Sequence, residues 1–152
     1  MPRIARSAVV PHPAAAMYEL VRDVESYPAF LPWVREARVL DESETRQTAT
    51  VSVTRGLPGT RFTTRNRLEP GRAIDASLVS GPFRRLEGRW RFEDLPDGGS
   101  RAELVVDFAF ASRLFATLTG PALARACDAV VAAFVRRADA LYGDGAADAL
   151  PG

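Results

Sequence analysis

The chain opens with an alternating segment and then changes to helical spacing. Residues 3–10 are rich in β-branched side chains, which predicts a first strand ended by Pro11. Pro13 fits the first position of a helix, and residues 14–22 carry apolar side chains three or four positions apart. Residues 23–27 predict a second helical turn. The pattern therefore predicts one strand followed by two short helices.

A segment crowded with aromatic residues comes next. Residues 27–33 read Tyr-Pro-Ala-Phe-Leu-Pro-Trp. Each proline fixes its own φ and pushes the preceding residue toward extended geometry, so Tyr27 and Leu31 are predicted to lie outside the helical region. The segment should form a rigid corner, which either makes one wall of a pocket or plugs the end of a core.

From residue 34 onward the hydrophobic pattern repeats every two residues. This alternation predicts short antiparallel strands with one apolar face and one wet face. The predicted strand segments are 34–39, 49–54, 61–68, 74–78, 85–93 and 103–111. Turn signals rich in glycine and proline separate several of them, at residues 56–59, 70–71 and 96–99.

The last part of the chain returns to helical spacing. Ser112 can cap a short helix over residues 113–119, and a longer helix runs from about residue 120 to Tyr142 with Gly143 as its stop. An apolar stripe follows this helix at intervals of three or four, formed by Leu123, Cys127, Val130, Phe134, Ala138 and Leu141. Residues 144–152 are predicted to be a flexible tail, which leaves residues 1–143 as a single domain.

These elements predict an α+β protein in which a twisted sheet faces one long helix. Such a helix cannot contact the sheet everywhere, so an apolar cavity can remain between them unless side chains fill it. The corner at 27–33 and the turn at 81–83 are candidates for its mouth. The candidate pocket residues are Tyr27, Phe30, Leu31, Trp33, Phe62, Thr64, Asn66, Phe83, Trp90, Phe92, Phe108, Phe110, Leu123, Val130 and Phe134.

Composition narrows the class of protein. The 152 residues are 47% hydrophobic and 26% charged with a net charge of +1, which is typical of one globular domain and gives no whole-molecule preference for nucleic acid or membranes. The single Cys127 excludes an intramolecular disulfide. No apolar run approaches the roughly 20 residues that span a bilayer, and no signal peptide is recognisable. We expect a cytoplasmic protein.

Candidate catalytic groups are few. His12 is the only histidine and lies between two prolines, which fits a loop or capping role better than a general base. Cys127 belongs to the apolar stripe, where an inert thiol is expected. No phosphate loop, dinucleotide fingerprint or metal-ligand cluster is present, so we expect no enzyme and no required cofactor. A metal-independent cyclase stays an alternative, with Thr64 and Asn66 as its polar groups; these two could equally bind a ligand's head group or each other.

All 20 basic residues are arginine, and several share the wet face of neighbouring strands. They are Arg61, Arg65, Arg67, Arg85, Arg89 and Arg91. Arginine contacts phosphates in a two-pronged manner, as an RNA-binding surface requires. Acidic residues are interleaved with them, however, at Glu69, Asp75, Glu87, Glu93 and Glu103. An ordinary solvated sheet face has the same mixture, so both interpretations stay open.

Five segments in this order resemble a known family. They are residues 27–33, 62–66 (Phe-Thr-Thr-Arg-Asn), 81–83 (Gly-Pro-Phe), 86–92 (Leu-Glu-Gly-Arg-Trp-Arg-Phe) and 133–138 (Ala-Phe-Val-Arg-Arg-Ala). Together they resemble the START-like helix-grip proteins of the coenzyme Q-binding and ribosome association toxin (RatA) type, within the polyketide cyclase/dehydrase-like superfamily. The similarity spans about residues 3–143. It implies a Bet v 1-like fold with a curved antiparallel sheet of about seven strands around the C-terminal helix.

The resemblance also implies a function. Members of this group are described as binding ubiquinone or related polyprenyl lipids in support of respiratory electron transport, and we expect this first. The bacterial branch is described as binding the large ribosomal subunit and blocking subunit association, and residues 62–66 and 80–83 look closer to that branch. Ribosome binding is therefore the alternative to lipid binding, and a polyketide cyclase activity is the second alternative. The expected partner is a hydrophobic small molecule, or the large ribosomal subunit if the alternative function holds. A transient contact with the surface of the inner membrane is also expected, whereas DNA is not an expected partner.

Overall fold

Seven strands form one antiparallel sheet in the order β1-β7-β6-β5-β4-β3-β2. The protein is represented by a computed structural model that describes residues 3–53, 60–81, 83–110 and 120–143. The strands are β1 (Arg3–Val10), β2 (Val34–Glu42), β3 (Arg46–Val53), β4 (Thr60–Glu69), β5 (Ala73–Ser80), β6 (Phe83–Asp94) and β7 (Ser100–Phe110). Every neighbour pair from β2 to β7 is consecutive in sequence, whereas β1 pairs with β7. The period-two pattern is thereby confirmed.

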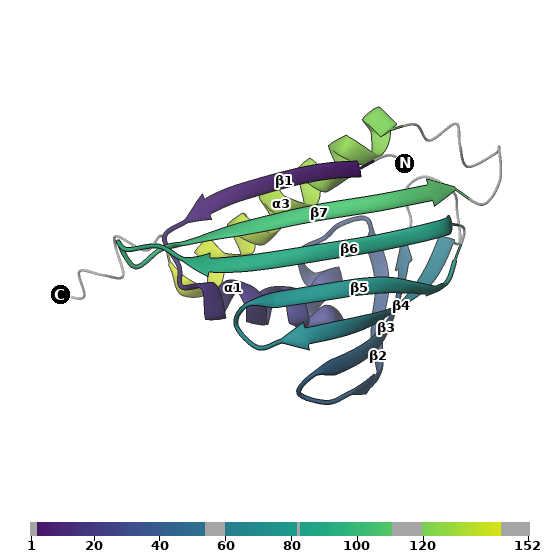
Figure 1. Ribbon diagram of the computed structural model, residues 1–152, viewed down its shortest axis with the longest axis horizontal. Helices are drawn as coiled ribbons and strands as arrows, with labels where there is room; N and C mark the ends of the chain where they lie inside the picture. Colours follow the sequence, from purple (N-terminus) through teal and green to yellow (C-terminus); the bar gives the residue numbers. More distant parts are fainter. Residues whose placement is uncertain (1–2, 54–59, 82, 111–119, 144–152) are drawn as a thin grey trace.

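Helices cover one face of this sheet. The short helices α1 (Ala14–Arg22) and η1 (Val24–Ala29, a 3₁₀ helix) follow β1, and α3 (Gly120–Tyr142) runs across the sheet on the same side as α1 (Figure 1). Gly143 ends α3 with a positive φ of 79°, as the sequence predicts. The helix-grip architecture expected from the sequence is confirmed.

The aromatic corner differs from its sequence prediction. Tyr27 does not lie in extended geometry, because it and Pro28 are part of η1. The Tyr27 carbonyl accepts hydrogen bonds from the amides of Phe30, at 3.1 Å, and Leu31, at 2.8 Å, and its hydroxyl donates to the carbonyl of Val21. These bonds stabilise a tight turn that outweighs the proline's local preference.

Two smaller predictions on the helices are also wrong. Pro13 caps α1 in extended geometry, with φ −64° and ψ 154°, and the helix begins at Ala14. Leu141 is 51% exposed, although its spacing places it on the apolar stripe of α3. The reason is its position in the last turn of the helix, whereas Cys127, Phe134 and Ala138 are buried, at 5%, 3% and 0% exposure.

Alternation along the strands separates an inner face from an outer one. On β6, Trp90 lies with its ring centroid 5.5 Å from that of Phe134 on α3, so the even-numbered positions face the helix. Arg65 and Arg67 of β4 are exposed, while Asn66 and Leu68 between them are buried. The predicted turn at 56–59, helix at 113–119 and tail at 144–152 lie outside the described residues. Within the described residues, no helix combines the length and apolarity needed to cross a membrane.

Candidate functional site

Aromatic rings predicted to line a pocket pack against one another under α3. The ring centroid of Phe134 lies 5.5 Å from that of Tyr27, 5.2 Å from Phe30 and 5.5 Å from Trp90. Trp90 in turn stacks on Phe92 at 5.8 Å. At this end of the sheet, the space between α3 and the inner face is therefore filled by side chains.

Seven further candidate pocket residues divide into three groups. Leu31 is buried in a small cluster with Val34 and Ala133, against which Trp33 packs. Phe108 is buried beside Cys127, and Val130 is half-buried and packs against both larger clusters. The side chains of a third group, Phe83, Phe110 and Leu123, lie outside the described part of the structure.

The inner face has open space at one position beside the filled region, and this position is called the hollow at Gly88 below. Ala76 of β5 and Gly88 of β6 lie directly opposite each other in the sheet, and both face inward. A Cβ added at Gly88 would meet no atom of the described residues within 4 Å. Phe62 and Leu86, which share this face, are only partly buried. Two small residues opposite one another thus leave open space that larger side chains would occupy.

Inward polar residues on β3 and β4 form a connected network. The Thr64 hydroxyl donates to Oδ1 of Asn66 at 2.9 Å, and Nδ2 of Asn66 donates to Oε1 of Gln47 at 2.8 Å. Nε2 of Gln47 then donates to the Arg22 carbonyl at 2.8 Å and to Glu42 at 3.0 Å. Of the options open from the sequence, the structure has Thr64 and Asn66 bonded to each other. Their hydrogen bonds tie the sheet to the end of α1.

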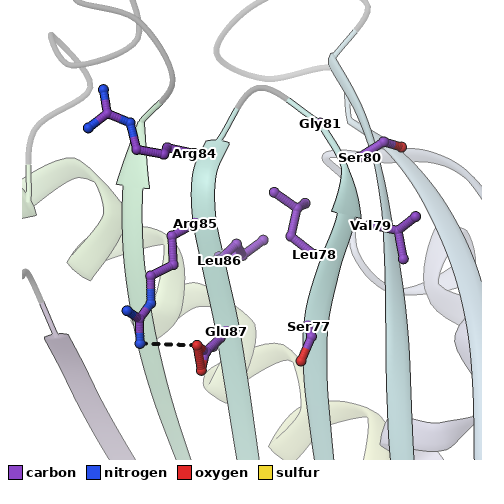
Figure 2. Close-up of a pocket in the computed structure, with 9 residues that line it drawn as sticks. All are labelled: Ser77, Leu78, Val79, Ser80, Gly81, Arg84, Arg85, Leu86 and Glu87. Carbon is purple, nitrogen blue, oxygen red and sulfur yellow. Dashed lines mark ion pairs between the residues drawn. The ribbon is translucent and has the colours of Figure 1, made fainter.

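Strands β5 and β6 separate at one end of the sheet. Their pairing ends at Ser77 opposite Glu87, and the chain connects the strands only beyond Ser80. A cleft of about 410 Å³ occupies this gap, and Figure 2 shows Leu78 and Leu86 pointing toward each other across it. Register shifts accompany the gap on both sides, on β5 against β4 and on β6 against β7. Such irregularities bend strands and re-aim side chains.

A second cleft, of about 730 Å³, lies beside the gap and is lined mainly by outward side chains of β4, β5 and β6. One row of facing residues crosses it from strand to strand: Arg46, Arg67, Asp75 and Arg89. A neighbouring row contains Arg65, Ser77 and Glu87. Most of these arginines are among the outward-facing ones predicted from the sequence, but Arg46 is not. The signal that could have found it is the strand register, which places it opposite Arg67.

The carboxylates near this cleft are already engaged in ion pairs. Asp75 binds Arg91 at 2.6 Å, Glu87 binds Arg85 at 3.0 Å (Figure 2), and the buried Asp107 binds both Arg3 and Arg89 at 3.0 Å. The hydrogen bond from Arg3 lowers the pKa of Asp107, with Arg89 adding to the effect and burial opposing it. No carboxylate in the described part of the chain forms an ion pair with the remaining three arginines: Arg46, Arg65 and Arg67.

The two candidate reactive groups lie away from both clefts. His12 is buried at 2% exposure, and its Nε2 lies 2.8 Å from Asp139 of α3, so it joins the end of β1 to the end of the helix. Burial raises the pKa of the Cys127 thiol and keeps it in the unreactive protonated form. Among the described residues, no group of three or more His, Cys, Asp or Glu is placed to hold a metal ion.

The comparisons with known proteins agree with this architecture. Residues 10–135 match the family model "Polyketide cyclase / dehydrase and lipid transport". The protein "Ribosome association toxin RatA" of Pseudomonas aeruginosa is 43% identical over 140 residues, which cover 92% of this chain and 97% of the relative. The mitochondrial "Coenzyme Q-binding protein coq10" of Schizosaccharomyces pombe is 24% identical, with 87% of this chain and 84% of the relative covered.

Solved structures confirm the fold. The Zhui aromatase/cyclase of a Streptomyces species superposes with a TM-score of 0.82 at 20% identity, covering 90% of this chain and 93% of that one. A START superfamily protein of Mycobacterium smegmatis superposes with a TM-score of 0.80 at 16% identity, covering 91% and 98% of the two chains. At these identities the likeness concerns the fold and not the activity.

Proposed function

This chain belongs to the polyketide cyclase / dehydrase and lipid transport family, and we propose that within this family it is a ribosome-associating protein acting in the cytoplasm. The observation that carries the proposal is the 43% identity to a protein named for ribosome association, over nearly the whole of both chains. Identity to the coenzyme Q-binding relative is 24%, so the order of the two functions expected from the sequence is reversed.

The outer face of the sheet supports the same proposal. Ribosomal subunits present RNA phosphates over much of their surface, and guanidinium groups bind phosphates in a two-pronged manner. The second cleft, called the outer cleft below, is lined by two carboxylates, Asp75 and Glu87, and by five arginines: Arg46, Arg65, Arg67, Arg89 and Arg91. Its electrostatics therefore suit a polyanionic partner, although the net charge of the chain is only +1.

Sedimentation through sucrose gradients tests this function. Purified protein is mixed with isolated large or small ribosomal subunits, and each fraction is assayed for the protein. We expect it to travel with the large subunit and to lower the yield of joined ribosomes when both subunits are present. A protein that stays at the top of the gradient with either subunit would contradict the proposal.

We propose hydrophobic-ligand binding as a second function, because of the hollow at Gly88. An isoprenoid tail, such as that of ubiquinone or a related polyprenyl lipid, would lie against the small inward residues Ala76 and Gly88, where half-buried apolar side chains flank the open space at Gly88. Burial of such a tail contributes roughly 25 cal/mol for each Å² removed from water, without any reactive group. Catalysis has less support, since Thr64 and Asn66 use their hydrogen bonds on each other and on Gln47.

A substitution that fills the hollow tests the second function. Gly88→Leu places a side chain in open space at a position without positive φ, so the fold should persist while quinone uptake falls at least tenfold. Solvent extraction with mass spectrometry and ultraviolet absorption measures the bound quinone. Ala140→Leu makes a similar addition at an exposed helix position and serves as the control. Equal uptake by wild type and Gly88→Leu would remove the hollow from consideration as the site.

A further inference from the structure

We propose that Arg46, Arg65 and Arg67 form a binding site for the RNA backbone of the ribosomal partner, at the β3–β4 side of the outer cleft. This inference rests on the proposed ribosome association and names the surface and the chemistry of that contact. The three residues are called the arginine triad below. Its members differ in ion pairing from the arginines on the opposite side of the same cleft.

The triad holds positive charge without compensation. Arg46 and Arg67 are direct partners across β3 and β4, an arrangement that places like charges side by side and destabilises the pairing. Arg65 lies two residues along β4 and therefore points to the same face. None of the three has an ion pair within the described residues, whereas Arg89 and Arg91 across the cleft each bind a carboxylate.

Asp75, a carboxylate that lines the same cleft, does not neutralise the triad. Asp75 lies directly opposite Arg67 in the strand register, between it and Arg89. Its Oδ1 is instead 2.6 Å from the guanidinium of Arg91. The triad thus keeps three exposed guanidinium groups free to donate to a bound anion.

The extent of the cleft indicates a polymer of phosphates as the occupant. Within the triad, Arg46 and Arg67 lie one strand spacing apart, about 5 Å, and Arg65 lies about 7 Å along β4 from Arg67. The triad thus extends in two directions over the cleft, so that successive phosphates of one backbone can each reach a guanidinium. The outer cleft, with a volume of about 730 Å³, also suits a rounded nucleic-acid backbone better than a flat bilayer surface. The ribosomal partner makes that backbone RNA.

The test compares two triple variants with matched charge changes. The first carries Arg46→Gln, Arg65→Gln and Arg67→Gln. The control carries Arg101→Gln, Arg125→Gln and Arg136→Gln, three exposed arginines outside the cleft that likewise lack ion pairs within the described residues. Binding to large subunits, and to RNA extracted from them, is measured over a series of salt concentrations.

We expect the triad variant to bind both probes more weakly and with a smaller salt dependence. Each lost phosphate contact lowers the slope of log affinity against log salt by about 1, so three contacts lower it by about 3. The control variant should keep the wild-type slope. Because the like-charge pair is relieved, the melting temperature of the triad variant should equal or exceed that of the wild type. That outcome separates a binding role from a structural one.

The outcomes that overturn the proposal are distinct from those that overturn ribosome association. If wild type fails to sediment with large subunits, the proposed function is wrong. If wild type sediments and the triad variant does so with the same slope, only the assignment of the surface is wrong. Sedimentation with vesicles containing anionic lipid is the third measurement. A triad variant that loses vesicles but keeps subunits and RNA would identify a membrane contact, again against the proposal.

Discussion

Arginines on the outer face differ in whether they form an ion pair with a carboxylate. Asp107 is buried between Arg3 and Arg89 and joins β1, β6 and β7 through its carboxylate. Arg46 and Arg67 face each other with no such partner in the described residues. The same residue type therefore contributes to stability at one end of the row and carries uncompensated charge at the other.

Asp107 should make the stability of the protein depend on pH in the acid range. Its pKa is lowered in the folded state, mainly by the hydrogen bond from Arg3, so it stabilises the fold above the unfolded-state pKa of about 3.9. This stabilisation is lost as the pH falls through the folded-state pKa. We expect Asp107→Asn to lower the urea midpoint at pH 7 and the difference from wild type to shrink at pH 3. A constant difference across this range would contradict the role of the carboxylate.

At the scale of elements, α3 determines how much of the inner face is filled. Phe134 touches rings from η1 and from β6, and so holds three elements together. At the end of α3, the bond between His12 and Asp139 fixes the helix to the turn after β1. The hollow at Gly88 lies on the inner face beside this ring cluster, where the strand contributes no side chain to meet the helix.

Truncation of the central ring should weaken this assembly strongly. Phe134→Ala removes a ring that is 3% exposed, and we expect it to lower the free energy of unfolding by about 3–5 kcal/mol. Leu141→Ala on the same helix, where the side chain is 51% exposed, should change it by only about 0.5 kcal/mol. Urea titration followed by circular dichroism measures both. Similar losses in the two variants would mean that the ring cluster is not the main contact of α3.

Sequence periodicity predicted the strands and the long helix because it reports which face a side chain takes. It does not report whether the space in front of that face is filled. Trp90 and Phe92 were correctly placed on the inner face, but their contacts with Phe134 depend on the position of α3. The prediction of extended geometry at Tyr27 was wrong because it considered only the local effect of Pro28. The hydrogen bonds that the Tyr27 carbonyl accepts from later amides outweigh that effect.

For the whole molecule, the two proposed sites occupy opposite faces of one sheet. The arginine triad points outward from β3 and β4, while the hollow at Gly88 faces α3. Only the thickness of the sheet separates the two surfaces, yet none of the side chains in the triad reaches the inner face. The fold thus offers separate surfaces for a large polyanion and for an apolar ligand.

This separation predicts that the two activities can be removed independently. The triad variant should take up quinone like wild type, and Gly88→Leu should sediment with large subunits like wild type. Both assays on both variants measure this directly. If filling the hollow also abolishes sedimentation while the melting temperature is unchanged, the two faces are coupled and the independence is wrong.

The pairing of β1 with β7 has a consequence for synthesis of the chain. Arg3 lies opposite Asp107, so the first strand finds its partner only after more than a hundred further residues have left the ribosome. Closing so long a loop is slow compared with forming the hairpins between β2 and β7. The nascent chain therefore first pairs the consecutive strands β2 to β7. At that stage β1 and the edge of β7 are still unpaired. Chaperones that shield unpaired strand edges would have their greatest effect at this last step of folding.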